Sequence, residues 1–516
     1  MPENSSTTLK TISNQHSYIH SVDHGPPVER KLGELEVSYF LPSLEDGVND
    51  MYLHLGCHAP PHLVEHQRVS LVWAIMRIRH PLIASTVKMN SYEDIAFVYN
   101  VPRSPNEAII KAEQSLEYRS QSKDDLIDAY LNGPRTLSNE RLSYLIVSCA
   151  DQSSGTQRNY DFLICATHFL GDGMGGHQFA NDFFSLLGSP SDLTSLREVL
   201  SKEWSERCFR GRERVPTLPS SMEERLPALG VGGLGRLGTR VDFIQNQRKQ
   251  VGGHTFPRDS KGSRRTVFPI TSIDRERTKK ILGNCKRRGV SISNALFAIC
   301  NIAWARTHST NRELPIMMYS ALNIRPNLMA DKCLNDSYWF LAIGYFNVIL
   351  PSFFPREGDL TGIFWHRARS AKIQTAKAAK SPLSVSRCRE MAKERGRQAR
   401  IWAKKNNDKA MGMPPKQPVP AVALLSEPKT PSSALMGLSL LGNLDEIYKH
   451  SAFPDIKFHT LTGGWRQRSG GMLLFGYTFV EKLWVSFGYD ENGFEENTVK
   501  QFWKNVIDAI DEFLLP

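Results

Sequence analysis

The sequence predicts a mixed α/β protein built from two halves. Its 516 residues exceed the usual length of one domain. Short apolar patterns typical of strands alternate with longer helical patterns along most of the chain. Between residues 222 and 265 the apolar periodicity disappears while glycine and arginine become frequent, which is typical of a linker. We therefore expect an N-terminal half over residues 1–225, a crossover linker over 226–264 and a C-terminal half over 265–516.

The N-terminal half is expected to mix strands with packed helices. A helix over residues 63–79 should stop before the His80-Pro81 pair, because the residue before a proline avoids the helical conformation. The other predicted elements are strands at 31–41, 82–87, 93–99, 141–149 and 161–167, a polar helical region at 106–131 and a helix from 177. The strands at 141–149 and 161–167 are expected to form a hairpin around a polar turn.

The C-terminal half repeats the mixture of strands and helices. Residues 294–307 are apolar on nearly every face, which predicts a buried helix. The other predicted elements are strands at 265–270, 314–322, 340–350, 472–477 and 483–488, a charged helix at 274–289 and a closing helix at 497–514.

The most informative stretch is residues 160–188, where an apolar strand ends at His168 and glycines follow. His168 and Asp172-Gly173 form an HxxxDG pattern. Histidine titrates near neutral pH, so a histidine at a strand tip is a candidate general base. The alternative is a histidine satisfied within an ordinary strand–turn–helix corner. Gly173 is expected to permit a backbone conformation and a close approach that a side chain would block, and Cys165 is interpreted as a core residue and not a nucleophile.

The positive charge of the chain is concentrated in one segment. The net charge is +11, and residues 366–409 contain 14 lysines and arginines against 3 acidic residues. These cations are expected on solvated helix faces. Alternatively, they could attract a polyanionic ligand such as the phosphates of coenzyme A or a nucleic acid. Trp402 is the clear aromatic residue of the segment, so the stacking platforms of a single-strand binder are missing.

Other sequence patterns argue against a dinucleotide site, disulfides and a metal site, and indicate the cellular compartment. Gly230, Gly232 and Gly235 satisfy GxGxxG, but no strand is expected before them and no helix after them, so a dinucleotide loop is dismissed. The eight cysteines include no CxxC pair and predict reduced core thiols, with neither disulfides nor a metal site. Residues 1–25 lack the apolar run of a secretory signal, and no apolar run is long enough to span a bilayer, so we expect a cytoplasmic protein.

Taken together, the order of motifs resembles the CoA-dependent acyltransferase superfamily over residues 31–514. This superfamily includes plant BAHD acyltransferases, fungal alcohol acetyltransferases and the condensation domains of peptide synthetases. The motifs are RHPLIASTV at 79–87, HFLGDG at 168–173, VSISNALFAICNIAWA at 290–305, NIRP at 323–326, IGYFN at 343–347, GGMLLFGYTF at 470–479, KLWVSFGYDENGF at 482–494 and FWKNVIDAI at 502–510.

Within that superfamily the chain is most similar to fungal trichothecene 15-O-acetyltransferases. The similarity rests on length and on KLGELEVSYFLP at 31–42, GVNDMYLHLGC at 47–57 and THFLGDGMGGHQFANDFF at 167–184. Two departures separate the chain from its neighbours. Condensation domains usually carry HHxxxDG, whereas Thr167 precedes His168 here, and the DFGWG signature of plant members is absent, with Gly463-Gly464-Trp465-Arg466 no equivalent of it.

The resemblance implies two chloramphenicol-acetyltransferase-like halves, with the active site in a channel between them. It implies transfer of an acetyl group from the co-substrate acetyl-CoA to a hydroxyl of a sesquiterpenoid, in particular the C-15 hydroxyl of a trichothecene. His168 would be the general base, and Asp172 would be held structurally by Arg325. No bound cofactor, metal, nucleic acid or membrane span is implied, and we expect a monomer.

Other interpretations stay open for several residues and for the function. Arg325 could instead be a surface residue of the turn before Pro326. Asn347 and Ser439 are candidate oxyanion or substrate contacts, although each could be a satisfied polar residue of the core. The chain could also acylate another alcohol or an amine, or be a basic nucleic-acid-binding protein.

Overall fold

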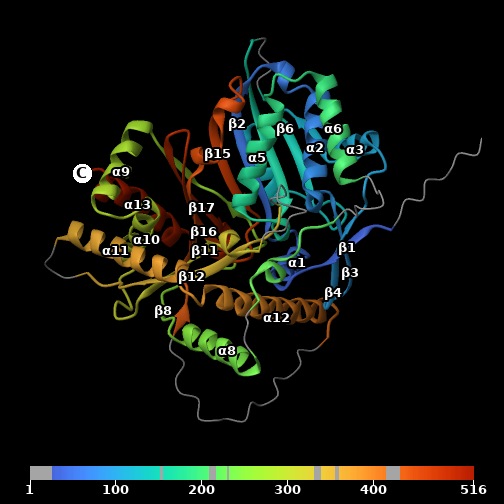
Figure 1. Ribbon diagram of the computed structural model, residues 1–516. Helices are drawn as coiled ribbons and strands as arrows, with labels where there is room; N and C mark the ends of the chain where they lie inside the picture. The colour runs from blue at the N-terminus through green and yellow to red at the C-terminus, as the bar shows by residue number, and fades with distance from the viewer. Residues whose placement is uncertain are drawn as a thin grey trace, which may run out of the picture.

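In the computed structural model of the protein, the described residues are 26–150, 155–208, 217–228, 232–329, 339–354, 359–413 and 431–516. They form two lobes, each with a large sheet packed against helices (Figure 1). The predicted mixed α/β class is confirmed. The boundaries expected at residues 225 and 265 stay a prediction.

The N-terminal lobe is built on a five-stranded sheet in the order β15-β2-β7-β6-β5. The strands are β2 (Asp50–Ala59), β5 (Leu116–Arg119), β6 (Ser143–Ser148), β7 (Arg158–Thr167) and β15 (Lys457–Trp465). The predicted hairpin is confirmed, because β6 and β7 pair as antiparallel neighbours; residues 151–154 of its turn lie outside the described residues. β15 comes from the C-terminal part of the chain and pairs with β2 along its length, so this sheet joins the two ends of the sequence.

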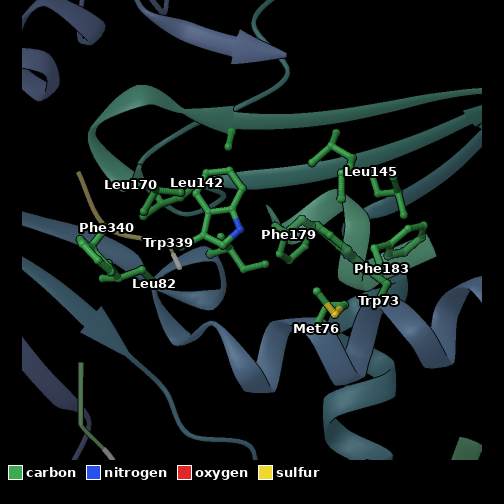
Figure 2. Packing of buried hydrophobic residues seen from close by; sticks show 14 of the residues in the cluster. Trp73, Met76, Leu82, Leu142, Leu145, Leu170, Phe179, Phe183, Trp339 and Phe340 are labelled. Atoms are coloured by element: carbon green, nitrogen blue, oxygen red, sulfur yellow. The ribbon is translucent and has the colours of Figure 1, made fainter. Parts of the chain in front are cut away.

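The helices of this lobe pack against the sheet and against one another. They are α2 (His66–Arg79), α3 (Pro105–Glu113), α4 (Lys123–Asn132), α5 (Gly173–Leu187) and α6 (Leu193–Arg207). Figure 2 shows Trp73 of α2 against Phe179 of α5, with ring centroids 5.9 Å apart. Trp339, from the second half of the sequence, packs its ring edge against Phe179 in the same core.

The C-terminal lobe contains a larger sheet in the order β10-β17-β16-β14-β11-β12, with β9 beside β17. The strands are β9 (Thr266–Val267), β10 (Ile270–Ile273), β11 (Ile316–Asn323), β12 (Ile343–Leu350), β14 (Met436–Asn443), β16 (Met472–Phe479) and β17 (Lys482–Asp490). The helices α9 (Arg275–Arg287), α10 (Ile292–Thr307), α11 (Leu360–Ala379) and α13 (Glu496–Leu514) belong to this lobe. Twelve of the sixteen residues of α10 are buried, which confirms the predicted core helix.

The strand predicted at residues 31–41 is wrong. The chain instead forms β1 (Val28–Lys31) followed by α1 (Glu34–Ser43). Glu36 accepts a hydrogen bond from the backbone N–H of Gly33, which caps the start of this helix. Because α1 is buried on almost every face between neighbouring elements, its apolar pattern lacks the polar face by which a helix is recognised.

Two other expected elements differ in detail. The polar region at 106–131 is divided into α3, β5 and α4, because β5 adds as an edge strand parallel to β6. The strand expected at 82–87 begins later, as β3 (Thr86–Ser91), after a helical turn at Pro81–Ala84. β3, β1 and β4 (Asp94–Tyr99) form a separate three-stranded sheet.

The expected linker contains a helix, α8 (Gly233–Arg248), so the expectation that no helix follows the GxGxxG pattern is wrong. The preceding element is the short helix α7 (Met222–Arg225) and not a strand, which still argues against a dinucleotide loop. Gly230 lies outside the described residues. The glycines and the few buried residues of α8 explain why its sequence shows no clear helical pattern.

The basic segment forms α11 and α12 (Ser384–Ala410), and part of its charge is structural. The buried guanidinium of Arg367 donates hydrogen bonds to the Asn301 side chain and to the Phe353 carbonyl. Arg400 forms an ion pair with Glu34 of α1. Solvated helix faces therefore do not account for all of these cations. Within the described ranges, no helix is long and apolar enough to cross a bilayer.

Candidate active site

A cavity of about 1490 Å³ lies between the two lobes. His168, Asp172 and Gly173 line it from the N-terminal lobe, while Asn347 of β12 and Ser439 of β14 line it from the C-terminal lobe. Pockets for one small molecule usually measure about 300 to 1,000 Å³. The central cavity is therefore larger than a pocket for one small molecule usually is.

The hydrogen bonds of His168 determine which of its nitrogens is free. His168 follows the last residue of β7 and begins a turn, His168–Leu170. Its Nδ1 lies 3.0 Å from the carbonyl oxygen of Gly171. A carbonyl can only accept a hydrogen bond, so Nδ1 carries the hydrogen. In the neutral ring Nε2 then has the lone pair, and among the described residues it has no hydrogen-bond partner.

The surroundings of the imidazole hold its ring and favour its neutral form. The ring of Tyr39 stacks on His168 with a centroid separation of 4.5 Å, and the edge of Trp465 lies 5.5 Å away. Burial lowers the pKa of His168 below its ordinary value of 6.5, while the charge of Asp172 opposes this shift. Its burial therefore favours the neutral form of the imidazole near pH 7.

The hydrogen bonds and the ion pair of Asp172 involve residues other than His168. The side chain of Asp172 is 6% exposed, and both of its carboxylate oxygens lie 2.9 Å from Nη2 of Arg325. The backbone N–H groups of Gly175 and Ala342 also donate to it, at 3.1 and 3.0 Å. Asp172 thus caps the start of α5 and ties this loop to the other half of the chain. The structure brings Asp172 and Arg325 together as an anchor.

No protein-family model matches the chain, and no curated protein matches its sequence. Its fold is similar to that of the TRI3 trichothecene 15-O-acetyltransferase from Fusarium sporotrichioides, with a TM-score of 0.73 and 14% identity over 95% of this chain and 96% of that one. The first condensation domain of the calcium-dependent antibiotic synthetase gives a TM-score of 0.58 with 10% identity, covering 95% and 97% of the two chains. The epimerization domain from the third module of tyrocidine synthetase B gives 0.56 with 12% identity, covering 96% and 100%. The protein has the two-lobed acyltransferase and condensation-domain fold.

The glycines around Asp172 have different reasons for being small. Gly173 begins α5 and does not have a positive φ, so the special backbone conformation expected for it is wrong. A Cβ at Gly173 would lie 3.3 Å from Cδ2 of Leu441, which is a tight contact with a flexible side chain. At Gly171 a Cβ would lie 2.7 Å from Cε3 of Trp339. Gly171 is therefore the position where a side chain is excluded by packing.

Asn347 and Ser439 face the same cavity as His168, from a different sheet. They lie on strands that flank β11, and Asn347 pairs with Tyr319 across the β11–β12 ladder. Their position permits contact with a substrate, and no hydrogen bond from either side chain is found within the described part of the chain. Cys165 is fully buried in β7 and does not line the cavity, and burial raises the pKa of its thiol. A role of Cys165 as a nucleophile has no geometric support.

Four residues near His168 escaped the sequence-based search. Tyr39 of α1 hydrogen-bonds through its hydroxyl to Tyr345 of β12, and the guanidinium of Arg395 lies 5.4 and 4.8 Å from the centroids of these two rings. Trp465 belongs to the Gly463-Gly464-Trp465-Arg466 segment, which is no equivalent of the plant DFGWG motif. A lone Tyr or Arg has no local signature, although an aromatic residue directly after a glycine pair on a strand was a usable signal for Trp465.

Proposed function

We propose that this protein is a CoA-dependent O-acetyltransferase. It moves the acetyl group of acetyl-CoA to a hydroxyl of a sesquiterpenoid, in particular the C-15 hydroxyl of a trichothecene. The observation that carries the proposal is the geometry of His168, whose Nε2 is free in a cavity between two lobes while Nδ1 is held by the Gly171 carbonyl. The likeness of the fold to the TRI3 acetyltransferase supports the choice of acceptor.

The proposed reaction needs one base and no covalent acyl-enzyme. Nε2 of His168 takes the hydroxyl proton while the alcohol oxygen attacks the thioester carbonyl carbon and forms the new C–O bond. The tetrahedral oxyanion then collapses, the C–S bond breaks and the thiolate of CoA leaves. The imidazolium returns the proton to this thiolate, which restores the neutral base. Asp172 has no part in these proton transfers because its oxygens bind Arg325 and two backbone N–H groups.

The test combines an acceptor screen with removal of the base. Labelled acetyl-CoA is incubated with the protein and a panel of trichothecenes, other terpenoid alcohols, simple alcohols and amines, and products are identified by mass spectrometry. His168→Ala is expected to lower turnover by about 100-fold or more while its circular dichroism stays that of the unmodified protein. Cys165→Ala is the matched control and should retain turnover. Full turnover in His168→Ala would reject the mechanism.

The same screen separates the alternative acceptors. Acetylation of an amine or of an unrelated alcohol, with no product from any sesquiterpenoid, would keep the chemistry and replace the acceptor. A nucleic-acid-binding function predicts a salt-sensitive affinity that survives His168→Ala. Arg367 and Arg400 bind other residues of the protein, so these two cations of the basic segment are not available to bind a nucleic acid.

A further inference from the structure

Helix α8 carries an apolar stripe on the outside of the molecule. It lies below α12 in Figure 1, away from both large sheets. Leu234, Leu237, Val241 and Ile244 are 85%, 60%, 49% and 37% exposed. Their spacing of three, four and three residues places them on one face of the helix. Contiguous exposed apolar side chains of this kind usually mark an interaction surface.

The opposite side of α8 is anchored, which keeps the apolar stripe facing outward. Phe243 is 7% exposed and packs inward. The carboxylate of Asp242 accepts two hydrogen bonds from Arg387 of α12, at 2.8 and 2.9 Å. Beside the stripe, Arg240 donates to Glu390 of α12. These contacts fix the rotation of α8, so its exposed leucines cannot turn into the protein without breaking them.

Basic residues accompany the apolar stripe. Arg236 and Arg248 are exposed, and neither forms an ion pair with a carboxylate of the described chain. The one acidic residue of α8, Asp242, is used by Arg387. An amphipathic helix that combines exposed leucines with unpaired cations matches the acyl chains and anionic headgroups of a phospholipid surface. The charge is what favours a lipid surface over a second copy of this basic protein.

The same helix forms part of the wall of the central cavity. Phe243, Ile244, Gln247 and Arg248 line it, next to residues of α12. We propose that α8 docks the protein on an anionic phospholipid membrane and so presents this end of the cavity to the bilayer, from which a lipophilic acceptor enters. The docking stands independently of the chemistry, whereas the entry of the acceptor rests on the proposed function.

The docking is tested by sedimentation of the full chain with phosphatidylcholine vesicles that contain or lack phosphatidylserine. The protein is expected to bind the anionic vesicles, and Leu234→Gln/Leu237→Gln/Val241→Gln is expected to weaken this binding about tenfold or more. None of these three residues lines the cavity. The matched control is Ile110→Gln/Ile373→Gln, which removes exposed isoleucines from α3 and α11 and should leave binding unchanged.

A second variant tests the contribution of the basic residues beside the apolar stripe. Arg236→Gln/Arg248→Gln should weaken binding to the anionic vesicles and reduce its salt dependence. The docking is overturned if the unmodified protein binds no vesicles, or if the apolar triple variant binds them equally well. It is also overturned if size-exclusion chromatography shows a dimer that the triple variant loses, because the stripe would then join two copies of the chain.

The entry route has its own readout. Acetylation of an alcohol dissolved in the vesicles should fall in the triple variant, whereas acetylation of a water-soluble alcohol should not. An equal loss for both alcohols would overturn the entry route. Since vesicle binding is measured without acetyl-CoA or acceptor, its failure leaves the proposed function intact, and retained binding without acetyl transfer would reject the proposed function alone.

Discussion

Replacing Arg325 with methionine should lower the free energy of unfolding. This loss should be larger than the rise in the activation free energy of the reaction. Arg325→Met keeps much of the aliphatic length but leaves the carboxylate of Asp172, whose side chain is 6% exposed, without its cation. Removing one partner of a buried ion pair costs about 3 to 5 kcal/mol. Asp172 keeps two backbone N–H donors, and the side chain of Arg325 is 19% exposed, so the lower end of that range, about 3 kcal/mol, applies.

A double-mutant cycle separates the pairing from the separate roles of the two residues. Asp172→Asn retains a good helix cap and should cost less than Arg325→Met, because the arginine it leaves behind reaches solvent. The double variant Asp172→Asn/Arg325→Met should cost less than the sum of the single variants by at least about 1 kcal/mol.

The free energy of unfolding is measured by urea denaturation, followed by tryptophan fluorescence, with the same dependence on urea concentration required of every variant. The kcat/KM of each variant is measured alongside. An unchanged unfolding midpoint in Arg325→Met would refute the anchoring role. Additive effects in the cycle would show that the two side chains do not stabilise the fold through one another.

The remaining predictions concern pH and the glycines of the motif. Protonated His168 cannot accept a proton, so kcat/KM should fall as pH decreases, and the lowered pKa places the midpoint below 6.5. A midpoint at or above 6.5 in a pH–rate profile would contradict the burial argument. Gly171→Ala should cost about 1 to 3 kcal/mol in the same urea assay, because its Cβ would lie 2.7 Å from Trp339. Gly173→Ala should cost less than about 1 kcal/mol, since Leu441 can move; the reverse order would refute the packing account.

The sequence predicted the elements that have a regular pattern of buried residues. The core helix α10 follows from a run of apolar residues, the closing helix α13 from its local pattern, and the hairpin of β6 and β7 from two apolar strands around a polar turn. The helices α1 and α8 were missed. α1 lacks a polar face, whereas α8 buries only Phe243 and contains three glycines, so neither has the amphipathic signature on which sequence-based prediction depends.

The sequence predicted only part of the candidate site. His168 was found because a strand tip, a glycine run and an aspartate lie within six residues of one another. Tyr39 and Trp465 were missed because they approach His168 from α1 and β15, which are distant in the sequence. Their contact with the imidazole depends on the pairing of β15 with β2 and on the burial of α1, and neither is encoded in local spacing.

By itself the sequence determined the mixed class, the strand that ends at His168 and the HxxxDG pattern, because each depends on residues close together in the chain. The tertiary structure decided which nitrogen of His168 is free, through the Gly171 carbonyl, and which partner Asp172 has, through Arg325 at a separation of 153 residues. It also decided that α8 turns its apolar face outward, through the Asp242–Arg387 pair. Hydrogen bonds and burial between distant segments set these outcomes, because folding alone brings those segments together.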